Sequence, residues 1–165
     1  MKKLNKGQRG FTLIELIIAI AIAGLITGGI TFAIMQLLTI NTRASNHMVA
    51  VRQVQQAGKE VSKDVLQAQS VTPGGSAFLA LNWTEVGGNQ TTHQIRYTLV
   101  DGRLEREDLG LNSTTIVAEY ISVASIAPNT SCSFPNCGAY NFTVTATLGD
   151  QSETRVYEVQ PRPGS

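Results

Sequence analysis

The sequence predicts an α+β protein in which a long N-terminal helix is followed by an antiparallel β-sheet. The first observation is the stretch from Leu13 to Ile40, which is apolar apart from a few uncharged polar residues and one carboxylate. About 20 apolar residues form a helix that spans a bilayer, so this stretch is long enough to do so. The second observation is that short runs rich in Thr, Val, Ile and Tyr dominate from Ser76 onward, which is typical of strands. A helix followed by a series of strands indicates an α+β fold.

The helix is expected to continue well beyond the apolar stretch. No proline precedes Pro73, so one helix from about Phe11 to Gln69 would be about 90 Å long at ~1.5 Å per residue. Beyond Ile40 the pattern becomes amphipathic, which predicts a helix lying against a domain. The apolar face carries Val51, Val54, Gly58, Val61, Val65 and Ala68, and the polar face carries Arg52, Gln55, Gln56, Lys59, Glu60, Lys63 and Asp64. Breakers at residues 71–75 then end the helix.

Two turn signals organise the expected sheet, which packs on the apolar face of the helix. Asp101-Gly102 and Gly149-Asp150 each separate two runs that read as strands, so each predicts a β-hairpin. We expect strands at Ala77–Thr84, Gln94–Val100, Arg103–Glu107, Thr115–Ala124, Asn141–Leu148 and Glu153–Val159.

Positive charge is concentrated at the N-terminus. Of the 13 basic residues, four lie within residues 1–10 without any acid: Lys2, Lys3, Lys6 and Arg9. This predicts that the N-terminus stays in the cytoplasm and that the rest of the chain lies outside it. Without residues 1–10, nine basic residues face 12 acidic ones, a formal charge of −3. Nucleic-acid binding is therefore not indicated, although a local basic patch is not excluded.

Glu15 is the residue that distinguishes the interpretations of the apolar stretch. A secretory signal peptide has an apolar region of about 7–15 residues, and this stretch is about twice as long. A plain membrane anchor leaves Glu15 unexplained, because a carboxylate at the centre of a membrane helix costs about 2.5–3.5 kcal/mol. The simplest variant of the anchor interpretation is that Glu15 lies near the helix end and reaches the membrane interface.

The segment Gly10-Phe11-Thr12-Leu13-Ile14-Glu15 resembles the class III signal of type IV pilins and type II secretion pseudopilins. The resemblance is strong over residues 6–40 and holds only in outline elsewhere. It implies that prepilin peptidase cleaves between Gly10 and Phe11 and methylates the new N-terminus of Phe11. It also implies that Glu15 pairs with the Phe11 amine of a neighbouring subunit during assembly. A buried carboxylate costs less when it is paired, so this acid would set the axial register of subunits.

The residue patterns and the resemblance together divide the chain into four parts: a leader (1–10), a transmembrane and filament-core helix (11–40), an amphipathic helix (41–70) and a globular β-domain (76–165). It implies a single-pass protein of the bacterial inner membrane that then enters a surface filament or a periplasmic pseudopilus. The implied partners are other pilin subunits, prepilin peptidase and the assembly machinery. No cofactor is implied.

Three glycines are expected to affect helix packing. Gly24 and Gly28 form a small-xxx-small pair that allows another helix to approach closely. Gly28 and Gly29 together weaken the helix, since each glycine costs about 1 kcal/mol relative to alanine. The resemblance implies that type IV pilins loosen this region in filaments. Many of them have proline near this point, whereas this chain has Phe32.

A second resemblance is confined to the hairpin at Tyr97–Arg106 and to the stretch Val51–Ala68. Both are similar to J-type pseudopilins and related minor pilins, which favours a minor subunit.

Cys132 and Cys137 are expected to form a disulfide, which suits an oxidising compartment. A zinc site is disfavoured because no further Cys or His lies near them. No catalytic or phosphate-binding signature is present, so we expect neither an enzyme nor a metal site. For the function of the chain, the alternatives to a pilus subunit are a membrane-tethered extracytoplasmic binding domain and a minor pseudopilin of a type II secretion system.

Overall fold

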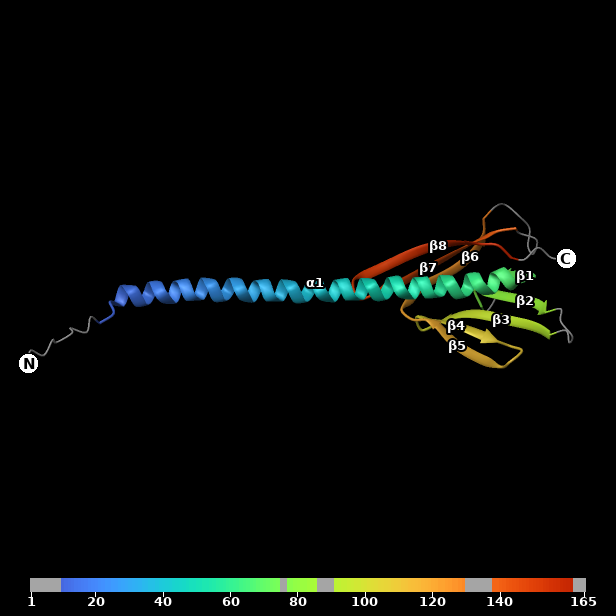
Figure 1. Cartoon of the computed structure of the whole chain (residues 1–165), viewed down its shortest axis with the longest axis horizontal. Helices are drawn as coiled ribbons and strands as arrows, with labels where there is room; N and C mark the ends of the chain where they lie inside the picture. The colour runs from blue at the N-terminus through green and yellow to red at the C-terminus, as the bar shows by residue number, and fades with distance from the viewer. Residues whose placement is uncertain (1–9, 75–76, 86–90, 130–137, 162–165) are drawn as a thin grey trace, which may run out of the picture. The chain divides into compact units, whose positions relative to one another are not determined.

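The computed structural model describes residues 10–74, 77–85, 91–129 and 138–161, and the chain divides into two compact units, Met1–Thr42 and Arg43–Ser165. Helix α1 (Leu13–Gln67) begins in the first unit and ends in the second (Figure 1). Its observed ends lie within two residues of the expected ones. With the antiparallel sheets that follow, it confirms the α+β class.

The strands form two antiparallel sheets instead of the single sheet expected. The five-stranded sheet has the order β1-β2-β3-β4-β5 and the three-stranded sheet has the order β6-β7-β8. The strands of the first sheet are β1 (Ser70–Pro73), β2 (Leu79–Glu85), β3 (Thr91–Val100), β4 (Arg103–Asp108) and β5 (Ser113–Ala118). Those of the second sheet are β6 (Ile121–Pro128), β7 (Tyr140–Leu148) and β8 (Gln151–Val159).

Both predicted hairpins are present. Asp101 and Gly102 between β3 and β4 have positive φ angles of 48° and 75°. Positive φ at both central residues is the requirement of a type I′ turn, which suits the twist of the strands it joins. Gly149 has a φ of 57° at the first position of the β7–β8 turn. Each turn therefore places a glycine where the backbone enters the left-handed region.

The prediction of one strand over Thr115–Ala124 was wrong. The chain turns a corner at Glu119 and Tyr120, so that β5 and β6 belong to different sheets. Tyr120 takes a φ of 59°, and the Glu119 amide donates a hydrogen bond of 2.8 Å to Oε1 of Gln53 in α1. The corner thus depends on a contact with a residue 66 positions earlier in the chain, which strand propensity does not reveal.

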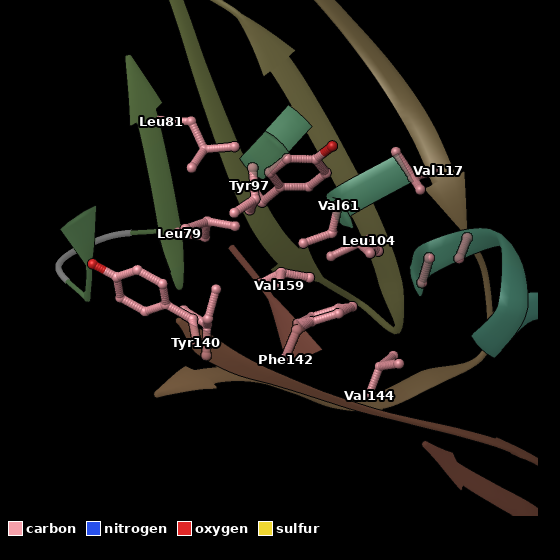
Figure 2. Close-up of a cluster of buried hydrophobic side chains, with 14 of the residues drawn as sticks. Val61, Leu79, Leu81, Tyr97, Leu104, Val117, Tyr140, Phe142, Val144 and Val159 are labelled. Atoms are coloured by element: carbon pink, nitrogen blue, oxygen red, sulfur yellow. The ribbon is translucent and has the colours of Figure 1, made fainter. Parts of the chain in front are cut away.

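The core lies between α1 and the inner faces of the two sheets. Figure 2 shows Val61 of α1 surrounded by side chains from both sheets. The most deeply buried large residues include Leu79, Leu81, Tyr97 and Leu104 from the first sheet and Tyr140, Phe142 and Val144 from the second. As predicted, α1 contributes Val54, Gly58, Val61 and Val65, whereas Val51 is only partly buried.

Asp64 was expected on the exposed polar face of the helix, and it is instead buried, with an exposed fraction of 3%. The Tyr97 hydroxyl donates a hydrogen bond of 2.7 Å to Oδ2 of Asp64. Arg106 Nε donates a second one of 2.6 Å to the same oxygen. Two strands therefore supply the partners that a buried carboxylate requires.

This buried cluster raises the pKa of both partners of Asp64. Burial, together with the negative charge of Asp64, raises the pKa of the Tyr97 hydroxyl. For Arg106, burial acts to lower the pKa, but the hydrogen bond and the charge of Asp64 outweigh it and the pKa is raised. The Asp64–Arg106 pair is thus a charged link between α1 and β4.

Candidate functional site

The start of α1 is built by a reciprocal pair of hydrogen bonds between Thr12 and Glu15. The Thr12 amide donates to Oε2 of Glu15 at 3.1 Å, and the Glu15 amide donates to the Thr12 hydroxyl at 3.3 Å. The Thr12 hydroxyl also donates to Oε2 of Glu15 at 3.0 Å. This is a capping box, which satisfies amides that the first turn of a helix leaves without partners.

The capping role of Thr12 is a feature that the sequence analysis missed. Its signal was available, since a threonine followed three residues later by glutamate, just before an apolar run, is the pattern of a capping box. The consequence is that the Glu15 carboxylate already accepts hydrogen bonds from Thr12 within the single chain. Its carboxylate is held beside the backbone of the residue that follows Phe11.

Gly10 and Phe11 precede the helix and are open to other molecules. A Cβ added to Gly10 would meet no atom within 4 Å, and Phe11 is 89% exposed. An accessible, non-helical peptide is what a protease needs to bind around a scissile bond. Residues 1–9, with the leader cations, lie outside the described residues.

The N-terminal part of α1 exposes every side chain that it carries. All residues from Gly10 to Ser45 are exposed, including many isoleucines and leucines. The helix is long and apolar enough to cross a membrane. An apolar surface that is continuous around a helix requires lipid or other helices to cover it.

Gly24, Gly28 and Gly29 lie within α1, which is helical throughout this region of the single chain. A Cβ at any of the three would meet no atom within 4 Å, so the surface beside them is free for close approach. Gly24 and Gly28 line a shallow depression with Ala23, Thr27 and other residues of the same helix. Close packing of a second helix here remains a prediction.

Threonine hydroxyls in the apolar part of α1 bond within the helix. The hydroxyls of Thr27, Thr31 and Thr39 donate to the carbonyl oxygens four residues earlier, at 2.8–3.0 Å. These bonds satisfy polar groups that would otherwise enter a bilayer unpaired. Glu15 is the only ionisable side chain from Leu13 to Ile40. It is therefore the one charge that a membrane or filament environment must accommodate.

Cys132 and Cys137 lie outside the described residues, so the expected disulfide is still a prediction. Within the described part of the chain, no group of three or more His, Cys, Asp or Glu side chains is placed to hold a metal ion.

Comparison with known proteins identifies the N-terminal segment. Residues 5–31 match the family described as the prokaryotic N-terminal methylation motif. This motif is the class III signal of type IV pilins and pseudopilins, and it indicates a protein of that type. A comparison with curated proteins finds no match to the chain. The motif covers Gly10, Phe11, Thr12 and Glu15, so the capping box lies inside it.

Proposed function

We propose that this chain is a structural subunit of a type IV pilus or a related pseudopilus. Prepilin peptidase cleaves it between Gly10 and Phe11 and methylates the amine of Phe11. The single observation that carries this proposal is the methylation motif at residues 5–31, which runs directly into an exposed apolar helix. The motif in general implies peptidase processing and assembly with other pilin-type subunits.

Cleavage would expose a positively charged amine at Phe11, four residues before Glu15. In our proposal the carboxylate of Glu15 leaves its bonds to Thr12 and pairs with the Phe11 amine of a neighbouring subunit. The exchange is favourable in an apolar surrounding, because a full opposite charge compensates a carboxylate better than neutral donors do. A subunit in the wrong axial position would bury both charges unpaired, so the pair selects one register.

The same helix serves first as an anchor and then as the filament core. Before assembly, residues 11–40 span the inner membrane with the N-terminus in the cytoplasm, as the leader cations favour. After assembly, neighbouring helices replace lipid around the exposed apolar residues. The β-domain then forms the filament surface. Within this scheme we propose a minor subunit, on the similarity of the Tyr97–Arg106 hairpin to J-type pseudopilins.

Two other functions compete with this one. The first is that of a minor pseudopilin of a type II secretion system, which shares the same assembly chemistry, and the second is that of a membrane-tethered extracytoplasmic binding domain. In all three cases we propose that the protein is not an enzyme. The tethered domain differs from the others because it does not need Glu15.

The experiment is to compare Glu15→Ala with Glu15→Asp in cells that assemble the filament. We expect Glu15→Ala to remain in the membrane at the parental level and to fall at least tenfold in sheared filaments, whereas Glu15→Asp retains part of the assembly. Gln36→Ala is the matched control, since it removes an uncharged polar group from the same apolar stretch. If Glu15→Ala enters filaments as well as the parent does, the assembly role of Glu15 is wrong.

A further inference from the structure

The two sheets end in four edge strands, and these edges differ in their protection. β1 is short and carries Pro73, and β8 carries Glu153, Arg155 and Glu158. Proline and charged side chains are devices that stop an edge strand from pairing with another chain. β5 (STTIVA) and β6 (ISVASIAP) contain no charged residue, and their only proline is the last residue of β6.

The unprotected edges are also accessible. Thr114, Thr115 and Ile116 of β5 are exposed, and so are Val123, Ser125 and Ala127 of β6. Among the strands that the structure describes, β5 pairs with β4 alone and β6 pairs with β7 alone. An edge strand directs alternate N–H and C=O groups away from its one neighbour, so both strands present a row of backbone donors and acceptors.

A groove runs beside β5 and gives an added strand a place to lie. It is lined by Gln56, Glu60 and Lys63 of α1, by Arg106 of β4 and by Thr115–Val117 of β5, with a volume of about 410 Å³. Its lining carries Glu60 and Lys63, which have opposite charges and lie three residues apart on α1, and Arg106, which is paired with Asp64. An uncharged strand therefore brings no further charge into the groove that would need a partner.

Both strands are irregular only near their shared corner. The register of β5 shifts between Leu104 and Glu105 of its partner, and that of β6 shifts between Ile121 and Val123. Such bulges disturb pairing locally. Away from the corner, Ser113–Ile116 and Val123–Pro128 keep regular registers with their neighbours, so these segments are the ones suited to pair with another strand.

We propose that β5 of one subunit pairs with β6 of a second copy of this chain, in an antiparallel ladder that covers the groove beside α1. The inference rests on the filament function proposed above. It requires only that two copies be neighbours, so a short run of copies within a mixed filament satisfies it. Because β5 and β6 are different surfaces, the contact is head-to-tail and continues from copy to copy, as in a helical filament.

The orientation of the strands supports this pairing over β5 with β5. The chain reverses at the corner beside Gly102, where the Ile121 amide bonds to the Gly102 carbonyl, so that β5 and β6 run in roughly opposite directions along the domain (Figure 1). A copy facing the same way thus presents β6 antiparallel to β5. Two β5 strands would instead pair about a two-fold axis and reverse one α1, whereas subunits anchored in one membrane all point in the same direction.

Cysteine cross-linking in assembled filaments tests the proposal on the full chain. Thr115→Cys is combined in turn with Val123→Cys, Ala124→Cys, Ser125→Cys or Ala127→Cys, which samples neighbouring registers, and the filaments are oxidised. We expect at least one combination to give a ladder of dimers, trimers and longer products, and each single variant to give none. The controls are the parent chain, for background from Cys132 and Cys137, and Thr115→Cys with Ser152→Cys on β8.

Four results would overturn the proposal. Dimers from Thr115→Cys alone would show β5 paired with β5, and products with Ser152→Cys would place β8 in the contact. Filaments that contain the chain but yield no ladder would show that copies do not meet through these edges, while the filament function would stand. If the chain never enters filaments, the proposed function fails and this pairing fails with it.

A charge introduced on the edge gives an independent readout. Thr115→Lys should lower the recovery of the chain in filaments at least fivefold, because a charged side chain blocks the edge in the way that natural edge strands are protected. Ser152→Lys is the matched control, on an edge that already carries charges. Equal recovery of Thr115→Lys and Ser152→Lys would contradict the proposal.

Discussion

The ring of Tyr157 in β8 lies directly against Gly58 of α1, and its hydroxyl donates a hydrogen bond of 3.2 Å to the carbonyl oxygen of Val54. A Cβ at position 58 would overlap the ring, so only glycine allows this approach. The aromatic ring of Tyr157 also stacks on Phe142, with 6.2 Å between ring centroids. Gly58 therefore lets the three-stranded sheet approach the helix.

Gly58→Ala should destabilise the β-domain, although alanine usually stabilises a helix. The expected overpacking cost is about 1–3 kcal/mol, which exceeds the gain in helix propensity of about 1 kcal/mol. Thermal unfolding of the detergent-solubilised chain, followed by near-ultraviolet circular dichroism, measures the difference. Gly28→Ala is the control, because a Cβ there meets nothing. An equal or higher melting temperature for Gly58→Ala would contradict the packing described here.

The buried link between Asp64 and Arg106 should be strongly coupled. We expect Asp64→Ala to lower the free energy of unfolding by about 2–4 kcal/mol, since it leaves Tyr97 and Arg106 without their acceptor. A double-mutant cycle with Arg106→Ala measures the coupling. The pair Arg96–Glu107 is the control, with an N–O distance of 3.4 Å and side chains that are 40% and 34% exposed. Its coupling should stay below about 1 kcal/mol, and equal couplings for the two pairs would refute the special role of Asp64.

Stability should fall in alkaline solution because of Tyr97. The pKa of Tyr97 is raised in the folded protein, so above about pH 10 the unfolded chain loses this proton first. The unfolded state then binds fewer protons than the native state, and stability decreases as the pH rises. Melting temperatures of the parent and of Tyr97→Phe, measured between about pH 8 and 11, should converge with rising pH. Tyr120→Phe, at an exposed position, should follow the parent, and parallel curves for the parent and Tyr97→Phe would contradict the prediction.

Removal of the Thr12 cap should loosen the first turn of α1. Thr12→Val keeps the shape of the side chain and removes its hydroxyl, which costs about 1 kcal/mol at a helix start. Amide exchange at residue 15 should then accelerate about fivefold when the full chain is studied in micelles by nuclear magnetic resonance. Thr39→Val is the control, because its hydroxyl bonds to the Met35 carbonyl within the helix. Unchanged exchange at residue 15 would show that the capping box does not form in solution.

The sequence was most informative where short-range rules decide the structure. The helix from Leu13 to Gln67 and the two hairpins follow from periodicity, from the absence of proline and from the turn pairs at Asp101-Gly102 and Gly149-Asp150. The capping box was equally local, and Thr12 could have been identified from its spacing to Glu15. These features depend on residues within one or two turns of each other.

Features that depend on distant residues were not predictable. Asp64 fits a polar helix face by its spacing, and only Tyr97 and Arg106, more than 30 positions later, make its burial favourable. The corner that separates β5 from β6 lies inside a run whose flanking residues favour one continuous strand, and it is fixed by Gln53 and Gly102. The methylation motif was recognisable at once because its residues are contiguous.

The most direct test of the filament account is the mass of the native N-terminus. Intact mass and N-terminal fragmentation would be measured on the protein from membranes and from sheared surface material. We predict a chain in the sheared fraction that starts at Phe11 and carries one additional methyl group on its amine. Its abundance relative to the other subunits would separate a minor from a major role. A protein that still starts at Met1, or one cut within the apolar helix beyond Ile22, would contradict the account.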